Sequence, residues 1–540
     1  MPQKTNLNIS PYYDDFDKAD NFYKVLFKPG FPVQARELST LQSILQNQVE
    51  SFGTHMFKDG SMVIPGGIAY DQEYYSLKIE EEHLGTPVTL YLNELIGLRL
   101  KGETTGNILS IDNFKKMEIA LHDIDPVRLK ASHDLLNIIS KKLDATPKIT
   151  SHTDRKESLK GSDFVQTTIQ VGGYNPSTII DFKIPNEFGL KQTIADTLGI
   201  GGIMRGLRTI PVLLDIAKDI TEICPKAIWL QYVNPMCSNM IAINKAFPEL
   251  KVMGLCHSVQ GTAEMLAKDL NEDINNIEYL CAGINHMAFY KKFEKKIEGK
   301  ANEDLYPKLK LLADKIINNE EESSRSNMVD NESNKILYEK VRYEILKRFG
   351  YFVTESSEHF AEYVPWFIKK NRNDVIEKYK IPIEEYIDRC ENNIKLWNDL
   401  EKDMSPIYEQ PLSRSNEYAS YIIDGIVNGN EITINANIMN EGYIDNLPSN
   451  CCVEVPCLIN ANGFMPQKIG KLPEQLTALM RTNINVQILT AEAALTKKRE
   501  HIYHAAMLDP LTGANLTIDE IYDMTDKLIE AHGNYLPQYK

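Results

Sequence analysis

Apolar residues recur at steps of three and four positions near the beginning of the chain. They are Leu38, Leu41, Leu45, Val49 and Phe52. This spacing places them on one face of a helix, so it predicts an amphipathic helix. Short extended runs follow at residues 62–64 and 88–92, separated by glycine turns, and they predict strands. Residues 1–107 are therefore expected to form a small α+β module.

From residue 117 onward the pattern changes to short apolar runs, which are typical of strands buried within a sheet. The predicted strands are residues 117–121, 164–171, 227–232 and 252–255. The turn Gly172-Gly173-Tyr174 follows the second strand, and Asn234-Pro235-Met236 follows the third. Ligands of open α/β sheets gather at the carboxyl ends of the strands. These turns are therefore candidates for binding.

Two further segments have patterns of their own. Gly199, Gly201 and Gly202 predict a loop before a helix at residues 204–220. Residues 318–334 contain almost no apolar residue, so they predict a solvated loop or a mobile insertion.

Composition narrows the class of protein. A chain of 540 residues predicts two to four domains. The formal net charge of −16 argues against nucleic acid as the main partner, because a phosphate-binding surface needs a basic excess. The eight cysteines all follow residue 223 without the spacing of a disulfide framework, which suits a reducing cytoplasm. We see neither a secretory leader nor a membrane span, so a soluble cytoplasmic protein is expected.

Cys256 and His286 are the first candidates for chemistry. Cys256 follows the apolar run at 252–255, and His286 closes another apolar patch 30 positions later, after a helix-like insert. Two ligands at strand ends joined by a helix are a usual way to build an open metal site, which leaves positions for substrate and water. Because free cysteines are among the most buried residue types, a pair of ordinary core residues is the alternative.

A second concentration of polar side chains lies among aromatic residues at 349–366. It contains Glu355, Glu358, His359, Glu362 and Tyr363. A sugar pocket needs such a mixture, since rings stack on the sugar and polar groups bind its hydroxyls. A helix with one polar face is the alternative.

Several segments together resemble a known family. They read G-L-C-H-S-V-Q-G-T-A-E from Gly254, C-A-G-I-N-H-M from Cys281, I-A-L-H-D-I-D-P from Ile119, I-Q-V-G-G-Y from Ile169, K-Q-T-I-A-D-T-L-G-I-G-G from Lys191, V-E-V-P from Val453 and R-T-N-I-N-V-Q from Arg481. With Asn234-Pro235-Met236 they keep one collinear order. From about residue 108 to the C-terminus, the chain resembles the family-four glycoside hydrolases, in particular their α-galactosidase and α-glucosidase branch.

The resemblance implies an α/β fold. A Rossmann-like parallel sheet is expected at residues 108–236, followed at 237–540 by an α+β, lactate-dehydrogenase-like catalytic domain with C-terminal helices. A dinucleotide fold opens with a strand and a G-x-G-x-x-G turn, about 20 to 30 residues before the acidic end of its second strand. Asp123 supplies that acidic end, but the glycines upstream have the wrong spacing. The first strand and its glycine turn are therefore expected to be lacking, and NAD+ to bind poorly.

The resemblance also implies a reaction. It is the hydrolysis of α-glycosides, with α-galactosides as the first choice of substrate and α-glucosides as the next. In this family bound NAD+ takes hydride from C3 of the sugar, which acidifies the proton on C2, and Mn2+ or another divalent metal stabilises the enediolate. After the aglycone leaves, water adds at C1 and the hydride returns to C3. A free sugar is expected rather than a phosphorylated one, because no new cluster of Arg and Lys adjoins the expected pocket in the sequence.

The family's catalytic and metal positions can be carried over residue by residue. Cys256 and His286 match the metal ligands. His257 matches the acid that protonates the leaving oxygen, and an imidazole can do so at neutral pH. Glu355 and Tyr363 are alternative candidates for the base.

The cofactor and substrate positions follow in the same way. Asp123, Gln170 and Asn234 are the residues expected to contact NAD, Asp123 through the adenosine ribose. Asn234, Asn285 and Asp196 are expected to contact the sugar.

The N-terminal part resembles a different family. Through P-Y-Y-D-D-F-D from Pro11, V-L-F-K-P-G-F-P-V-Q-A-R-E-L from Val25 and F-K-D-G-S from Phe57, residues 11–106 are similar to a structural protein family of large tailed phages. This resemblance implies phage virion proteins as partners, and the two resemblances meet near Asn107. The alternative to an enzyme is therefore a virion-associated structural protein, or a chimeric product with a non-functional glycosidase remnant. For the enzyme, the glycosidase family implies a homodimer or homotetramer.

Overall fold

A computed structural model describes most of the chain. It covers residues 13–17, 24–27, 32–56, 82–83, 86–87, 99–101, 108–110 and 118–540, except 328–329, 331–332, 410 and 413–414. The chain divides into two compact units, Met1–Lys115 and Lys116–Lys540. The expected domain boundaries at 107 and 236 stay predictions.

The first unit contains the predicted amphipathic helix. This helix is α1 (Ala35–Met56), and the acidic pair of the N-terminal motif anchors it: Ser43 donates a hydrogen bond to Asp14, and Arg36 pairs with Asp15. Two short antiparallel pairs follow, β1 (Glu82–His83) with β2 (Thr86–Pro87) and β3 (Arg99–Lys101) with β4 (Ile108–Ser110). The extended runs predicted at 62–64 and 88–92 lie outside the described residues.

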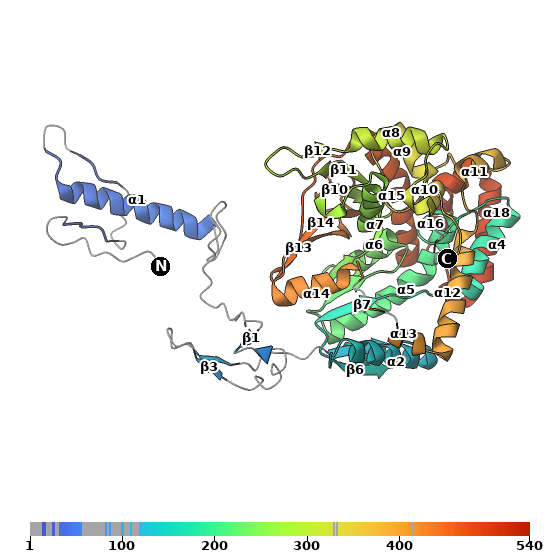
Figure 1. Ribbon diagram of the computed structural model, residues 1–540, viewed down its shortest axis with the longest axis horizontal. Helices are drawn as coiled ribbons and strands as arrows, with labels where there is room; N and C mark the ends of the chain where they lie inside the picture. The colour runs from blue at the N-terminus through green and yellow to red at the C-terminus, as the bar shows by residue number, and fades with distance from the viewer. Residues whose placement is uncertain are drawn as a thin grey trace. The chain divides into compact units, whose positions relative to one another are not determined.

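The second unit is built on a nine-stranded sheet, which confirms the predicted α/β class (Figure 1). Its order is β12-β11-β10-β14-β13-β9-β8-β7, with β15 beside β14. The strands are β7 (Phe164–Thr167), β8 (Ile228–Gln231), β9 (Lys251–Gly254), β10 (Ile277–Ile284), β11 (Met287–Lys295), β12 (Glu303–Asp304), β13 (Ile432–Met439), β14 (Cys452–Asn460) and β15 (Gly463–Pro466). The strands β7, β8 and β9 are parallel, whereas the remaining pairs are antiparallel. The sheet thus joins a Rossmann-like half to an α+β half.

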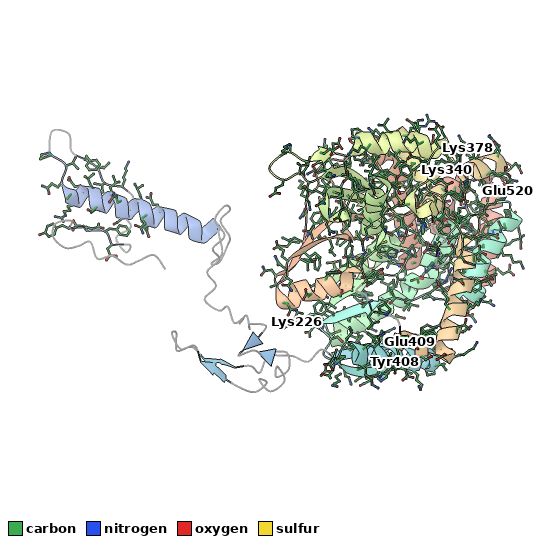
Figure 2. The ribbon with its side chains drawn as sticks, viewed as in Figure 1. Lys226, Lys340, Lys378, Tyr408, Glu409 and Glu520 are labelled. Atoms are coloured by element: carbon green, nitrogen blue, oxygen red, sulfur yellow. The ribbon has the colours of Figure 1, made fainter. Side chains whose placement is uncertain are left out.

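Helices cover this sheet. The core helices are α5 (Gly199–Ile223), α6 (Met236–Ala246), α7 (Ser258–Asp269) and α15 (Glu474–Thr496), and α15 packs against α5 and α6. The others are α2 (Pro126–Lys142), α3 (Arg155–Leu159), α4 (Ile179–Glu187), α8 (Tyr306–Ile317), α9 (Lys340–Phe349), α10 (Ser357–Glu362), α11 (Asn373–Tyr379), α12 (Glu385–Lys402), α13 (Ser405–Glu409), α14 (Tyr418–Asn428), α16 (Arg499–Leu508), α17 (Pro510–Asn515) and α18 (Ile518–His532). Glu520, labelled in Figure 2, closes a capping box with Thr517 at the beginning of α18. None of the described helices combines the length and apolar character that a membrane span requires.

One loop prediction is wrong, and a second holds only for part of its segment. Gly199, Gly201 and Gly202 belong to α5 itself, and their lack of side chains lets the helix approach the preceding loop: a Cβ on Gly201 would lie 2.6 Å from the Cβ of Ala195. Residues 318–334 are not a solvated loop throughout. Ser323 and Ser326 are buried, and Asp269 at the end of α7 accepts hydrogen bonds from the Ser323 hydroxyl and the next backbone N–H.

The chain also forms a separate two-stranded parallel sheet from β5 (Glu118–His122) and β6 (Lys148–His152). The predicted strands at 117–121, 227–232 and 252–255 correspond to β5, β8 and β9, while the run predicted at 164–171 is strand only as far as Thr167. In the part of the chain that the structure describes, no strand pairs with β5 other than β6, or with β7 other than β8. The expected lack of a first Rossmann strand stays a prediction, because residues 102–107 and 111–117 lie outside the described residues.

Two helical glycines test how tightly α5 packs. Gly201→Ala is expected to destabilise the protein by about 1–3 kcal/mol, because the new methyl group collides with Ala195. A Cβ at Gly261 in α7 would lie in open space, so Gly261→Ala should stabilise the protein by about 0.5–1 kcal/mol. Urea unfolding of the full chain measures both. A G201A protein as stable as the G261A protein would contradict the close contact.

Candidate active site

The Cys256 sulfur and the His286 imidazole meet in the interior of the second unit. Cys256 follows β9, and Asn285-His286 is the two-residue turn of the hairpin between β10 and β11, with His286 at φ 60°. The Sγ of Cys256 lies 3.3 Å from Nε2 of His286, and both side chains are buried. The predicted pair is therefore assembled.

Four residues near the Cys256–His286 pair form one row across neighbouring strands. Gly254 on β9 is opposite Asn437 on β13, Asn437 is opposite Glu454 on β14, and Glu454 is opposite Gly283 on β10. A Cβ on Gly254 would lie 2.6 Å from the sulfur of Met236, and one on Gly283 would lie 2.6 Å from the Cα of Ala288. The two glycines therefore permit the close packing that brings the strand ends together.

Two hydroxyls orient His286. The Oγ1 of Thr197 and the Oη of Tyr363 each lie 3.2 Å from its Nδ1. A hydrogen bond at one ring nitrogen fixes the orientation and the tautomer with which the other can bind a metal. This arrangement leaves Nε2 directed at Cys256.

These residues fit a divalent metal ion. Their separation of 3.3 Å suits two ligands of one ion, given metal–sulfur and metal–nitrogen bonds of about 2.3 and 2.1 Å. Among the described residues, no set of three or more His, Cys, Asp and Glu side chains is arranged to hold an ion. The side-chain amide of Asn285 is fully buried and neither of its polar atoms has a hydrogen-bond partner. Buried polar groups usually have one, so this amide is suited to a ligand.

A carboxylate and a second imidazole lie next to His286. The Oε2 of Glu355 is 2.8 Å from Nδ1 of His359, and the rings of His359 and His286 are 5.1 Å apart. Burial alone would raise the pKa of Glu355, but the imidazoles of His359, His286 and His257 outweigh it and hold this pKa well below its usual range. Burial raises the pKa of Tyr363 well above its ordinary value. Of the two candidate bases, Glu355 is therefore the ionised one.

His257 is the exposed member of the group. Its Nδ1 lies 3.3 Å from the Glu417 carboxylate, and its side chain is 68% exposed. The hydrogen bond to Glu417 and then the Cys256 sulfur raise the pKa of His257 to about 10. The imidazole therefore carries a proton at neutral pH.

Two of the expected substrate residues, Asn234 and Asp196, belong to a hydrogen-bonded chain that leads to His286. Asn234 donates to Asp196, and the Thr197 hydroxyl donates to the other oxygen of Asp196 at 2.7 Å. Burial works to raise the pKa of Asp196, but Arg205 and the neighbouring imidazoles lower it. Asp196, Asn234 and His286 thus belong to one connected cluster.

A cavity of about 280 Å³ opens beside this cluster. His257, Glu355, Glu358 and His359 line it, together with Arg325, Arg342 and Arg389 from three different segments. No cluster of arginines and lysines was visible in the sequence, and the three arginines that meet here come from positions far apart in the chain. Carboxylates match each of them: Arg325 pairs with Glu339 and Glu358, Arg342 with Glu339, and Arg389 with Glu385.

Two residues of this region that received no role from the sequence nevertheless stand out in it. Arg325 is the one cation within the polar run at 318–334, and it reaches the pocket wall. Glu454 interrupts an apolar strand, and burial and then the Cys256 sulfur raise its pKa well above the ordinary value. A charged residue at such a position was a sign of a special environment.

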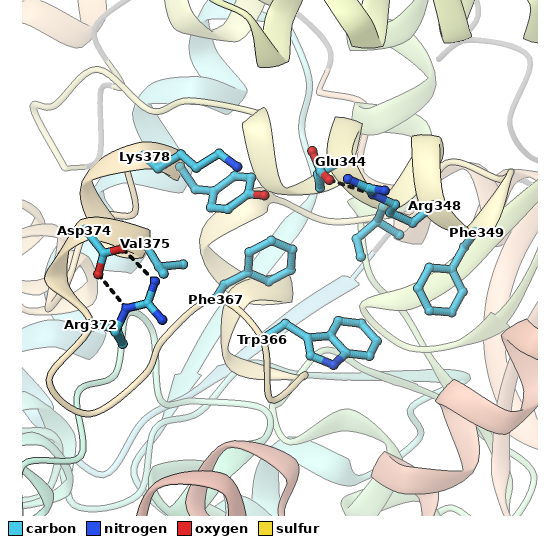
Figure 3. Close-up of a pocket in the computed structure, with 11 residues that line it drawn as sticks. Glu344, Arg348, Phe349, Trp366, Phe367, Arg372, Asp374, Val375 and Lys378 are labelled. Atoms are coloured by element: carbon cyan, nitrogen blue, oxygen red, sulfur yellow. Dashed lines mark hydrogen bonds and ion pairs between the residues drawn. The ribbon is translucent and has the colours of Figure 1, made fainter.

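A larger cavity of about 600 Å³ lies elsewhere (Figure 3). Phe349, Trp366 and Phe367 line it, with the ion pairs Glu344–Arg348 and Arg372–Asp374 at its sides. None of the predicted site residues lines it, so size does not identify the site.

The residues expected to contact the dinucleotide already have hydrogen-bond partners within the protein. Asp123, at the end of β5, is held by both Nε and Nη2 of Arg128, at 2.6 and 2.7 Å. The exposed Gln170 donates to the Thr178 hydroxyl, and Asn234 is bound to Asp196. Within the described residues we find no glycine-rich turn between a strand and a helix at the beginning of this sheet.

Glu362, at the end of α10, shapes the loop that carries Asp196 and Thr197. Its carboxylate accepts hydrogen bonds from the backbone N–H groups of Thr193, Ile194 and Ala195. Burial nevertheless raises the pKa of Glu362 to about 7. The sequence predicted a sugar-pocket residue at this position, with a polar helix face as the alternative, whereas the carboxylate binds backbone groups about 170 positions earlier in the chain.

Comparisons with known proteins agree with this arrangement. Residues 101–272 match the domain described as Family 4 glycosyl hydrolase, residues 281–512 match the Family 4 glycosyl hydrolase C-terminal domain, and residues 10–88 match a domain of unknown function (DUF4815). The chain is 45% identical over 435 residues to the alpha-galactosidase of Bacillus subtilis (strain 168), covering 81% of this chain and 96% of that protein. It is 31% identical to the alpha-galactosidase of Rhizobium meliloti (strain 1021), covering 80% and 86%. The fold is similar to a 6-phospho-alpha-glucosidase from gut microorganisms solved with NAD and Mn2+, with a TM-score of 0.65 and 18% identity over 79% of this chain and 94% of that one.

The titration of Glu362 provides a test of its burial. Its pKa of about 7 in the folded protein exceeds the value of 4.5 that an exposed carboxyl has, so the folded state binds more protons between these values. The free energy of unfolding should therefore fall as the pH rises from about 4.5 to about 7, and this group should contribute roughly 3 kcal/mol to the fall. In Glu362→Gln this loss should be absent, which urea unfolding at several pH values measures. The exposed Glu249→Gln is the matched control, and a difference between E362Q and the unaltered chain that does not vary with pH would contradict the assignment.

Proposed function

The chain belongs to the family 4 glycosyl hydrolases, and from this we propose that it hydrolyses α-glycosides, with α-galactosides as its substrates. The observation that carries the proposal is the buried Cys256–His286 pair beside a cavity that also contains His257 and Glu355. The 45% identity to a bacterial alpha-galactosidase supports the substrate class. α-Glucosides are the second choice.

Cys256 and His286 would hold the divalent ion, Mn2+ being the ion named for a similar structure. Such an ion acts as a Lewis acid that polarises sugar oxygens and stabilises negative charge on them. Thr197 and Tyr363 keep Nε2 of His286 available to it. Asn285, Asn234 and Asp196 surround the pair with polar groups suited to sugar hydroxyls.

The proton transfers are assigned to Glu355 and His257. Glu355 is ionised and paired with His359, so it is the base that accepts a proton from the sugar, and Tyr363 is a positioning residue for His286. His257 is protonated and partly exposed at the mouth of the site, where it can donate to the leaving oxygen. The ionised Glu417 holds it in place.

The arginines of the cavity support a free sugar rather than a phosphorylated one. Arg325, Arg342 and Arg389 each have a glutamate partner within hydrogen-bond distance. A phosphate ester would have to compete with those carboxylates for the guanidinium groups. A neutral galactoside needs no such exchange.

The family's other cofactor fits the described residues only in part. Asp123 is engaged by Arg128, and the described residues provide no pyrophosphate-binding turn. We therefore assign no hydride step to these residues. The oligomeric state and the phage partners of residues 1–107 stay predictions.

Sugar binding and turnover together test the function. With Mn2+ and a thiol reductant, the full chain should bind methyl α-galactoside more tightly than methyl α-glucoside or an α-galacturonide, as calorimetry measures. With NAD+ added it should release 4-nitrophenol from the corresponding α-galactoside. Cys256→Ser should abolish Mn2+-dependent binding, since a hydroxyl is a poor replacement for a thiolate ligand. A folded protein that binds Mn2+ but none of these sugars would overturn the proposal.

The roles of Glu355 and Tyr363 separate by their effects. Tyr363→Phe should weaken Mn2+ binding by about 10-fold, because it removes a group that orients His286. Glu355→Gln should leave Mn2+ affinity unchanged and lower kcat by about 10²–10⁴-fold, because it removes the base. Titration with Mn2+ and steady-state kinetics measure the two effects. The opposite result, with Y363F affecting only kcat, would assign the base to Tyr363.

A further inference from the structure

The larger cavity of the second unit, of about 600 Å³, has no part in the proposed reaction. Two stretches of the chain line it, residues 344–349 of α9 and residues 366–379, which end with α11. We call it the Trp366 cavity. Ligand pockets in proteins occupy about 300–1,000 Å³, so its volume is that of a ligand site.

Aromatic rings form the centre of its wall. Figure 3 shows Trp366 and Phe367 in the middle of the lining residues, with Phe349 next to Trp366. The ring centroids of Phe349 and Trp366 are 5.6 Å apart, and the two planes are inclined by 33°. Phe367 is buried, whereas Trp366 is 43% exposed. The indole of Trp366 therefore offers an apolar surface on which a ligand can stack.

Two ion pairs flank these rings on opposite sides (Figure 3). On one side, Nε and Nη2 of Arg372 donate to the two carboxylate oxygens of Asp374, each at 2.7 Å. On the other side, Nε of Arg348 donates to the Glu344 carboxylate at 2.8 Å. A guanidinium has five N–H donors and a carboxylate about four lone pairs, so both pairs keep donors and acceptors for a ligand. Hydroxyl groups, which donate and accept at once, match such pairs.

The charges of the wall favour a neutral ligand. A phosphate or carboxylate would have to compete with Asp374 and Glu344 for the two guanidinium groups. The third cation among the lining residues is Lys378, whose Nζ lies 4.9 Å from the centroid of the Tyr379 ring. A pyranose ring meets these conditions, because it combines an apolar C–H face with hydroxyls around its edge.

We propose that the Trp366 cavity is a second carbohydrate site, which binds a neutral galactopyranoside without a metal. The axial hydroxyl at C4 of galactose leaves the hydrogens of C3, C4 and C5 on one face of the ring, and this face stacks on Trp366. The Arg372–Asp374 and Glu344–Arg348 pairs bind the hydroxyls at its edge. The choice of galactose rests on the proposed function.

Helix α9 connects this site with the catalytic cavity. Arg342 lines the catalytic cavity, and Arg348, less than two turns further along the same helix, lines the Trp366 cavity. The two sites are therefore neighbours. A galactoside held at Trp366 stays close to the place where it reacts.

Removal of the metal separates the two sites, because sugar binding at Cys256 and His286 is expected to need Mn2+. With EDTA and a reductant, the full chain should still bind methyl α-galactoside with a Kd of about 1 mM, as calorimetry measures, since a ligand of this size gains about 4 kcal/mol. Trp366→Ala should weaken this binding about tenfold or more, because the stacking surface is lost. Arg372→Ala should weaken it about 2- to 10-fold through the lost hydrogen bonds. Trp397→Ala in α12, outside the cavity, is the matched control and should have no effect.

Several results would overturn the proposal. They are a lack of binding in EDTA, equal binding by W366A and the unaltered chain, and tighter binding of inorganic phosphate or galactose 6-phosphate than of methyl α-galactoside. Unaltered Mn2+ affinity shows that each variant is folded. Binding that needs Mn2+ and is lost in C256S tests the proposed function, and W366A should leave it unchanged. Either proposal can therefore fail while the other stands.

Discussion

The close packing around Gly254 on β9 and Gly283 on β10 is the constraint on which the site depends. Gly254, Asn437, Glu454 and Gly283 are paired in one row across four strands, and neither glycine position has room for a Cβ. Cys256 lies two residues beyond one end of this row, and His286 three residues beyond the other. Without this packing the thiol and the imidazole would be ordinary core residues far apart.

Charge pairing around the cavity explains how so many ionisable groups can be buried together. An unpaired buried charge is costly. Here Glu339 forms ion pairs with both Arg325 and Arg342, and Glu355 pairs with His359. These pairs tie the short helix Ser324–Asn327 to α9 and α10. They also leave little uncompensated charge on the cavity wall. A wall of this kind suits a neutral, hydroxyl-rich substrate that is oriented by hydrogen bonds.

The two halves of the second unit differ in completeness. The catalytic half has its antiparallel strands, its core helices and its connected polar cluster in place, while in the dinucleotide half the described residues provide no second partner strand for β5 or β7. A family assignment applies to the whole chain, but each part of the chemistry requires its own residues.

The sequence by itself determined the local elements and indicated the candidate metal pair, Cys256 and His286. Three- and four-residue periodicity located α1, and apolar runs located β5, β8 and β9, because these patterns follow from the geometry of single elements. Collinear motifs fixed the family. They also showed that the glycine turn before Asp123 was missing, since a spacing is visible without a structure.

Only the tertiary structure decided which distant residues meet. It placed Arg325 from a polar run in the cavity, made Glu362 the support of a loop about 170 positions earlier, and packed the glycines of α5 against Ala195. It also distinguished an ionised Glu355 from a Tyr363 that orients His286. Periodicity describes one element at a time, whereas burial, hydrogen-bond partners and pKa values depend on neighbours that folding brings from elsewhere in the chain.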